Sequence, residues 1–448
     1  MIIKLIQPKV LPRPMDTKLK TRMSPSLALL TIANLTPKEH KVIIENENVE
    51  KIDFDEPVDL AAITVTVDVM NRAAEISKEF QKRSVTVIAG GIHITADPEG
   101  SLKSFDAICV GMAERVWAKI LKDKESNSLK KIYCDMENIS GREIVSPDYN
   151  IIDNKKYLYT NIISTSRGCP FKCDFCYNSC KDSLKTYINR PVEDVIKDIK
   201  ALKTRHIMFI DDNFIGNPGW TKKLLKKIKP LKLKWNAAVT SNIVDMPELL
   251  DEMRDSGCQS LFIGFESINS KSIESVHKVQ NSVRKYEKLA DEIHKRGIMI
   301  NASFVFGLDE DDTSVFKSTL EWIVKNKIET VTSHILTPYP GTKLYSSLIE
   351  NQRISDFNLA NYNTAHVVYK PRNMTLDELY NGYLWIYKEV YTFKNIMKRL
   401  PECKKQWIPF LAFNLFYRKF GKLTEILCNI FSFKNTGRFF RWLSYHIK

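Results

Sequence analysis

Hydrophobic and polar positions alternate along the first 120 residues with two different periods. Short apolar runs with the period of a strand lie at 2–6, 42–45, 60–65 and 85–89, and stretches with the period of a helix lie at 27–35 and 69–83. Strands that alternate with helices are typical of a parallel, doubly wound sheet. Ligands of such sheets bind beyond the carboxyl ends of the strands. We therefore predict an α/β, Rossmann-like unit over residues 1–135.

A second alternating series begins near residue 162. Its predicted strands are 162–165, 206–210, 236–239, 260–264, 299–306 and 330–335, and amphipathic helices are predicted at 192–202, 221–228, 246–256, 283–296 and 314–326. Six strand–helix units predict a partial (β/α)6 barrel over residues 161–345, with functional groups at the carboxyl ends of its strands. The polar stretch 122–154 has few periodic signals and is interpreted as a linker, assigned to 136–160. Residues 346–448 are expected to form a helical C-terminal extension.

Three cysteines, Cys169, Cys173 and Cys176, follow the first predicted barrel strand within eight residues. A loop of this length can give thiolates to three irons of a cubane cluster and leave the fourth iron open. A structural zinc site would need a fourth ligand, which Cys180 could supply, but the spacing of three and then two residues is unusual for zinc folds. The motif predicts a 4Fe-4S cluster, with Cys180 as an ordinary loop thiol.

With Phe175 before the last cysteine, the motif resembles that of the radical S-adenosylmethionine superfamily. The resemblance implies that the open iron binds S-adenosylmethionine. One-electron reduction, by a partner such as flavodoxin or ferredoxin, then cleaves it to methionine and a 5′-deoxyadenosyl radical. The resemblance also implies cofactor contacts at later strand ends, namely Asp211, Asp212 and Asn213 after the second strand, Gly264, Glu266 and Ser267 after the fourth, and Phe306 and Gly307 after the fifth. For Glu266 and Gly307 the alternatives are a helix-starting pair and a simple turn.

Residues 1–120 resemble the cobalamin-binding domain that precedes the barrel in a large subgroup of these enzymes. The landmarks are the helix opening at 25–30, the polar stretch 46–50 and the turns at 90–93 and 111–114. Small residues at strand ends suit a broad, flat corrin that must approach the backbone closely. The resemblance therefore implies cobalamin contacts at Thr64, Thr66, Gly90 and Gly91. His93 is a further candidate, with a hydrogen bond that orders the loop as the alternative.

The two resemblances together predict a methyltransferase that acts on an unactivated carbon of a small or lipidic substrate. Cobalamin-independent radical chemistry, such as ring formation or methylthiolation, is the alternative. Methylthiotransferases usually carry three further cysteines in the front domain, whereas only Cys109 and Cys134 precede the motif here. The net charge of +14 raises a third hypothesis, an RNA-binding iron–sulfur protein, but no recognisable RNA-binding module accompanies it.

The last 48 residues combine twelve aromatic and nine basic residues with two acidic ones. Leu423, Ile426, Leu427, Ile430 and Phe431 recur at helical spacing, and this apolar face is compatible with packing onto the barrel. The remaining aromatic residues from 410 to 442 are expected to be harder to bury. We predict peripheral association with anionic membranes. Since the chain has neither an export signal nor a run of about 18 apolar residues, we expect a cytoplasmic protein, attached by its tail to the inner face of the membrane.

Overall fold

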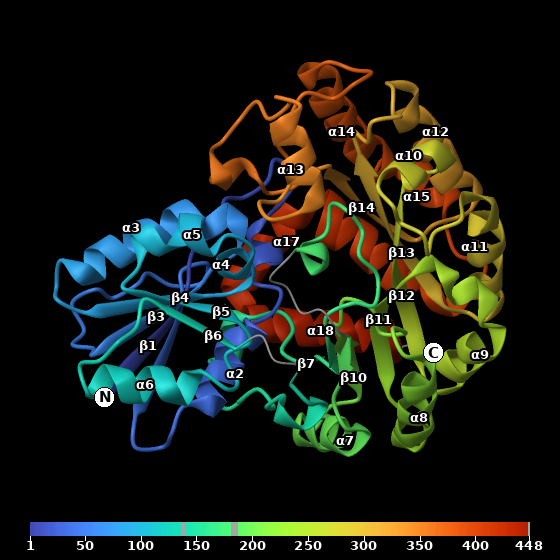
Figure 1. Cartoon of the computed structure of the whole chain (residues 1–448). Helices are drawn as coiled ribbons and strands as arrows, with labels where there is room; N and C mark the ends of the chain where they lie inside the picture. The colour runs from blue at the N-terminus through green and yellow to red at the C-terminus, as the bar shows by residue number, and fades with distance from the viewer. Residues whose placement is uncertain (136–138, 181–186, 447–448) are drawn as a thin grey trace.

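The computed structural model describes residues 1–135, 139–180 and 187–446 (Figure 1). The chain forms two α/β units, an N-terminal one drawn in blue and cyan and a barrel drawn from green to orange. The C-terminal helices, in red, lie between the two units and along the barrel strands. The α/β fold class and the mostly helical C-terminal region that the sequence predicts are confirmed.

All strands of the N-terminal sheet are parallel, in the order β2-β1-β3-β4-β5-β6. Their bounds are Ile2–Gln7 (β1), Lys41–Asn46 (β2), Leu60–Thr64 (β3), Thr86–Gly90 (β4), Ala107–Gly111 (β5) and Ile132–Asp135 (β6). The intervening helices are α1 (Lys18–Thr21), α2 (Leu27–Leu35), α3 (Met70–Gln81), α4 (Ile92–Ala96), α5 (Pro98–Ser101) and α6 (Trp117–Glu125). Two apolar clusters pack around this sheet, as expected of a doubly wound fold.

One sequence prediction needs correction in this unit. The stretch 122–154 is not a linker throughout, because it contains the end of α6 and the edge strand β6. Only Tyr133 is buried among the four residues of β6, so the strand leaves almost no periodic signal. The helix predicted at 69–83 is confirmed as α3, and a 3-10 turn at Val67–Val69 precedes it.

The second sheet is an open barrel of six parallel strands in the order β7-β10-β11-β12-β13-β14. The strands are β7 (Ile162–Ile163), β10 (His206–Phe209), β11 (Lys234–Val239), β12 (Cys258–Glu266), β13 (Met299–Phe306) and β14 (Thr330–Ile335). The helices of this unit are α7 (Val192–Ala201), α8 (Pro218–Ile228), α9 (Pro247–Asp255), α10 (Ser270–Ser275), α11 (Tyr286–Lys295), α12 (Ser314–Lys325), α13 (Lys343–Glu350) and α14 (Leu376–Val390). A large apolar core joins the strands to the covering helices. The predicted barrel units are thereby confirmed.

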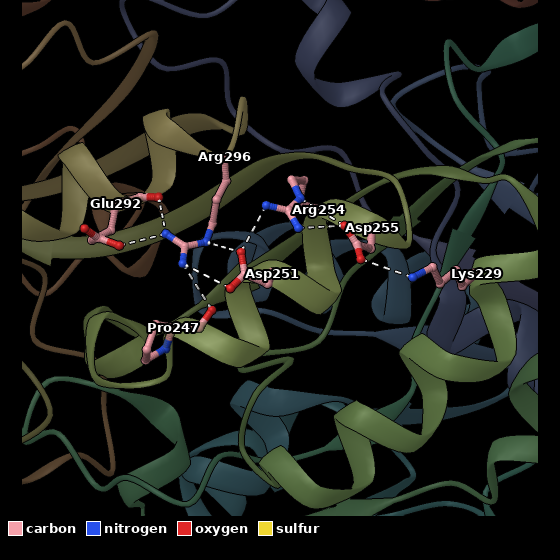
Figure 2. Close-up of polar contacts among 7 residues, drawn as sticks. All are labelled: Lys229, Pro247, Asp251, Arg254, Asp255, Glu292 and Arg296. Atoms are coloured by element: carbon pink, nitrogen blue, oxygen red, sulfur yellow. Dashed lines mark hydrogen bonds and ion pairs between the residues drawn. The ribbon is translucent and has the colours of Figure 1, made fainter.

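Charged side chains connect the outer helices of the barrel (Figure 2). Arg296, at the end of α11, donates hydrogen bonds to Glu292 at 2.7 Å and to Asp251 of α9 at 3.0 Å. Arg254 and Lys229 continue the series by pairing with Asp255, and these partners lower its pKa. The ion pairs lie at the solvent side of the helix layer, where each contributes little to stability.

The C-terminal region continues with α15 (Phe393–Lys398), α16 (Trp407–Leu411), a π-helical stretch (Ala412–Lys419), α17 (Gly421–Phe431) and α18 (Phe433–His446). One buried guanidinium anchors it. Arg399 donates to the carbonyl oxygens of Ile328 at 2.8 Å and Val390 at 2.7 Å, and to Oδ1 of Asn414 at 3.1 Å. Asn414 in turn donates to the carbonyl oxygen of Glu329 at 3.0 Å. The π-helical stretch is therefore fixed to the segment that leads into β14.

The burial expected for the C-terminal aromatic residues is reversed in part. Phe410 is fully buried, and Phe413 and Phe440 are half-buried against the barrel. The regular apolar face of α17 instead points to solvent, with Ile426 56% and Ile430 66% exposed. The helical period identifies which residues share a face, but it does not tell which face meets the barrel.

Candidate active site

The cysteine loop starts at the carboxyl edge of the barrel. Immediately before it, β8 (Ser166–Arg167) pairs antiparallel with β9 (Ile188–Asn189). Within the loop, the N–H of Cys176 donates to the carbonyl oxygen of Cys173 at 3.0 Å. The next side chain, Tyr177, stacks on Tyr339 from the loop after β14, with ring centroids 4.6 Å apart. These contacts join the first and last strands of the barrel through the cysteine loop.

The three thiols form the donor set that a cluster requires. Burial raises the pKa of Cys169 and raises that of Cys176 to about 12, and negative charge on the neighbouring thiols adds to both shifts. Among the described residues, no three His, Cys, Asp or Glu side chains converge as ligands of one ion. In a cubane each thiolate binds a different iron, so three thiols on one loop have the donor chemistry that such a cluster needs.

Asp211 binds the strand that enters the cysteine loop. Its buried carboxylate accepts hydrogen bonds from the backbone N–H groups of Thr165 at 2.8 Å and Ser166 at 2.6 Å, and from both of their hydroxyls. Burial raises the pKa of Asp211, and the four hydrogen bonds oppose that shift. The contacts give Asp211 a positioning role, because they occupy the carboxylate that the sequence suggested for a cofactor.

The two residues after Asp211 have different surroundings. Asp212 accepts a hydrogen bond from Asn178 at 3.1 Å, and its charge contributes to the raised pKa values of Cys169 and Cys176. The side chain of Asn213 is buried, and its Nδ2 has no partner among the described residues. Asp212 is therefore the carboxylate of this strand end that lies beside the thiols.

Glu266 combines an unusual backbone with a buried ion pair. A register shift interrupts the pairing of β12 with β13 between Gly264 and Glu266, and Glu266 has a φ of 62°. Positive φ at a non-glycine residue is strained and is concentrated at functional sites. The bulge directs the carboxylate onto Nζ of Lys278, and both side chains are buried. The pair faces the cysteine loop, because Nζ of Lys278 also lies 5.9 Å from the centroid of the Phe175 ring.

No sequence pattern singles out the segment 278–281, which completes this site. Lys278 pairs with Glu266, while Nε2 of Gln280 donates to the sulfur of Cys173 at 3.4 Å. Asn281 donates to the carbonyl oxygens of Gly264 at 2.8 Å and Phe265 at 3.1 Å, and so supports the bulge. The segment reads as an ordinary polar loop after α10. Only its tertiary contacts show that it links the fourth strand to the cysteines.

Other predicted residues serve the loops around the site. The hydroxyl of Ser267 accepts from the N–H of Asn269 at 3.0 Å. The ring of Phe306 is buried against Phe316 of α12, with centroids 5.0 Å apart, so this side chain faces the outer helices. Gly307 has a φ of 94°, and a Cβ there would collide with Tyr369. Close packing against the segment before α14 thus explains why residue 307 is a glycine.

A cavity of about 210 Å³ lies at the carboxyl ends of the N-terminal strands. Thr64, Gly90 and Gly91 line it, and so does Arg167 of the barrel unit. Gly91 has a φ of 113°, and a Cβ there would lie 2.8 Å from the carbonyl oxygen of Val65. Only glycine fits this turn without displacing the backbone. The small residues at this edge fit a flat ligand that approaches the main chain.

Two predicted residues are not part of this lining. The exposed hydroxyl of Thr66 donates to Asp68 at 2.6 Å. His93 is buried, burial lowers its pKa, and its Nδ1 has no partner among the described residues. The expected hydrogen bond that would order the loop through this nitrogen is therefore absent from the described part of the chain.

Known proteins resemble both units. Residues 163–323 match the family described as the Radical SAM superfamily. Two relatives from Chlorobaculum tepidum are bacteriochlorophyllide d C-12(1)-methyltransferase, 28% identical over 89% of this chain and 90% of the relative, and bacteriochlorophyllide d C-8(2)-methyltransferase, 29% identical over 83% and 87%.

A solved structure shows the same fold. It is the radical S-adenosylmethionine methyltransferase TsrM from Kitasatospora setae with cobalamin and a [4Fe-4S] cluster bound, at a TM-score of 0.63 and 16% identity, covering 78% of each chain. The family match runs from β7 through the cysteine loop to α12, which is the segment that carries Cys169, Cys173, Cys176 and Glu266. Residues 163–323 are therefore similar to the Radical SAM superfamily, and the two relatives extend the similarity over most of the chain.

Proposed function

We propose that this enzyme is a cobalamin-dependent methyltransferase that acts on an unactivated carbon of a small or lipidic substrate. The position of Arg167 carries the proposal. Arg167 lines the strand-end cavity of the N-terminal unit, pairs there with Glu114 at 3.5 Å, and precedes Cys169 by two residues. The cavity and the cysteine loop are therefore neighbours. The names of the two relatives support methyl transfer.

Each group of residues has a distinct task in this proposal. Cys169, Cys173 and Cys176 would hold a 4Fe-4S cluster, which with S-adenosylmethionine and one electron supplies a 5′-deoxyadenosyl radical. Glu266 and Lys278 would bind and orient polar groups of S-adenosylmethionine, since their pairing is preformed and buried. Asp212, beside the thiols, would accept from its amine. A flavodoxin or ferredoxin is proposed as the electron donor.

The N-terminal unit would hold cobalamin, which supplies the methyl group. Thr64, Gly90 and Gly91 would contact it, since they line the cavity with little side-chain bulk. Arg167 lines the cavity and is followed two residues later by Cys169. Binding of cobalamin beside Arg167 would therefore affect the position of the cysteine loop through the backbone. The parts needed for radical formation and for methyl supply would then meet at one boundary between the units.

The C-terminal face supports a further part of the proposal, contact with an anionic membrane. Leu423, Ile426 and Ile430 form an exposed apolar stripe along α17, and Lys422, four residues before Ile426, lies on the same side by helical spacing. Basic heads beside exposed apolar side chains complement an anionic lipid surface. In the described part of the chain, no helix is long and apolar enough to cross a bilayer.

Analysis of reaction products tests the proposed function. The reconstituted, reduced enzyme with S-adenosylmethionine and cobalamin should release both 5′-deoxyadenosine and S-adenosylhomocysteine, measured by mass spectrometry. Cys169→Ala, Cys173→Ala or Cys176→Ala should abolish both products together with iron content and visible absorbance, because three thiolates are needed to hold the cluster. Cys180→Ala, the control from the same region, should retain them. Deoxyadenosine alone would argue for a radical reaction without methylation.

Removing the carboxylate of Glu266 should weaken binding of S-adenosylmethionine. Glu266→Gln leaves the ammonium group of Lys278 buried without its counter-charge, so the dissociation constant should rise by about tenfold or more. Equilibrium dialysis with labelled S-adenosylmethionine measures this, and cluster absorbance should stay unchanged. Glu274→Gln, on the exposed side of α10, is the matched control. Equal affinities in the two variants would exclude Glu266 from the site.

Adding a side chain at Gly91 should release cobalamin without loss of iron. Gly91→Ala introduces a Cβ that must displace the Val65 backbone and strains a residue with positive φ, so the turn moves into the cavity. The corrin absorbance that survives desalting should fall, while iron content stays constant. Gly297→Ala is the control, because its φ is also positive and its Cβ would meet nothing within 4 Å. Wild-type protein that keeps no corrin would refute the cobalamin part.

Substituting glutamate for apolar residues on the outer face of α17 should weaken binding of the enzyme to anionic vesicles. Ile426→Glu combined with Ile430→Glu should reduce co-sedimentation with phosphatidylglycerol vesicles at low salt by at least about tenfold, because apolar burial and charge attraction are both lost. Val279→Glu is the control, an 81% exposed apolar residue on the barrel. If the wild type ignores anionic vesicles at low salt, the membrane proposal fails.

A further inference from the structure

A chamber of about 550 Å³ lies between the inner face of the barrel sheet and the C-terminal helices. Its lining differs from that of the N-terminal cavity, with which it shares no residue. Cavities of this size, largely apolar with a few polar groups, are typical of small-molecule sites. Nothing in the tasks proposed above for the cysteine loop or for the N-terminal unit uses it.

The barrel wall of the chamber consists of two consecutive layers of inward side chains. In the first layer, Met208, Asn236, Ser260 and Met299 lie side by side on neighbouring strands. The second layer contains Ala238, Phe262, Asn301 and Thr330 in the same way. Asp211, at the carboxyl end of β10, also lines the chamber. The chamber therefore runs along the barrel interior from these two layers to the strand end that binds the entry to the cysteine loop.

The opposite wall is aromatic and comes from the C-terminal helices. It includes Phe410, Phe413, Phe416, Tyr417 and Phe440. The rings pack in pairs, with centroids 5.0 Å apart for Phe413 and Tyr417 and 5.3 Å for Phe416 and Phe440. Because Arg399 and Asn414 fix this stretch to the barrel, the rings form a prepared surface. Such a surface favours rigid rings, which offer stacking contacts and lose little conformational entropy on binding.

Two carboxamides give the chamber a polar spot. The Oδ1 atom of Asn236 accepts from the hydroxyl of Ser260 at 2.8 Å, and that of Asn301 accepts from Thr332 at 3.5 Å. Among the described residues, neither NH2 group has an acceptor. A ligand oxygen in the chamber would satisfy these donors, which otherwise remain at an apolar wall.

The upper end of the chamber borders the polar pair of the active site. The next inward layer contains Gly264 beside Ser303. A Cβ at Gly264 would lie 2.5 Å from Oε1 of Glu266 and 2.9 Å from Nζ of Lys278. The missing side chain thus leaves only small groups between the chamber and that pair. A molecule in the chamber would extend toward the place where radical formation is proposed.

We propose that this chamber binds the apolar, ring-containing body of the substrate, and that Asn236 and Asn301 donate to an oxygen acceptor on it. The inference rests on the proposed function, because it takes the Glu266–Lys278 pair as the site of S-adenosylmethionine. It assigns a substrate class, a rigid polycycle that carries a carbonyl, ether or carboxyl oxygen.

Fluorescent polycycles test the chamber in the full-length, cluster-loaded enzyme without S-adenosylmethionine or reductant. Pyrene should bind and show the vibronic band ratio of an apolar site. Ala238→Trp fills the chamber from the barrel side and Ala412→Trp from the helix side, so each should weaken pyrene binding by about tenfold or more. Cluster absorbance and thermal melting verify that each variant is folded. Ile430→Glu, on the outer face of α17, is the control and should bind pyrene like the wild type.

A second probe tests the polar spot. Asn236→Leu and Asn301→Leu should each lower the affinity for 1-acetylpyrene about two- to tenfold and leave that for pyrene unchanged, because only the ketone accepts a hydrogen bond. The proposal that the chamber binds rings would be overturned if pyrene binding survived both tryptophan variants. Loss of pyrene binding in Ile430→Glu would overturn it as well. Tighter binding of the chain-like cis-parinaric acid would overturn the ring preference. Since these measurements need no turnover, their failure is distinct from failure to form the two products of S-adenosylmethionine.

Discussion

An open parallel sheet has an inner face that must be covered, and this requirement determines the architecture of the chain. With β7 and β14 as its edges, the six-stranded barrel does not close on itself. Its inner face carries Phe262, Met208 and Met299, which are unfavourable in water. The C-terminal helices provide the cover, and Arg399 fixes them to the segment that leads into β14. Because the cover is aromatic and incompletely interlocked with the strands, it leaves a chamber where a close-packed core would otherwise lie.

The same constraint explains why α17 is apolar on its outer side. Residues of α16, the π-helical stretch and α18 supply the aromatic side chains that face the barrel, whereas α17 packs with α1 through Gly421 near Thr17 and leaves Leu423 and Ile426 exposed. A helix that merely completed the fold would not need apolar residues there. The outward stripe is thus a separate feature, and it places an apolar surface on the same region that closes the chamber.

How far the sequence predicts the structure depends on how local the signal is. The barrel strands β13 and β14 end where alternation predicts, because inward and outward residues along a strand meet different environments. The edge strand β6 was missed, since one buried residue leaves no period. The role of Lys278 was missed for a different reason. The sequence shows only a lysine in a polar loop. Its role is visible in the structure, where a bulge 12 residues earlier directs Glu266 onto Lys278. Likewise, Asp211 sits at the predicted strand end, but its hydrogen bonds to Thr165 and Ser166 are long-range facts.

The proposed radical chemistry requires that reactive groups be held in place before the radical forms. The site meets it with buried polar contacts that leave little freedom. Asp211 secures the entry to the cysteine loop, Asn281 supports the bulge at Glu266, and Tyr177 stacks on the loop after β14. Asp211 connects the end of β10 to β8, Asn281 connects a loop to β12, and Tyr177 connects the cysteine loop to the loop after β14. Such preorganisation is built into the rigid strand ends, whereas the ion pair of Arg167 with Glu114 is only half-buried. This ion pair places Glu114 of the strand-end cavity beside the start of the cysteine loop, so the two sites meet at one side-chain contact.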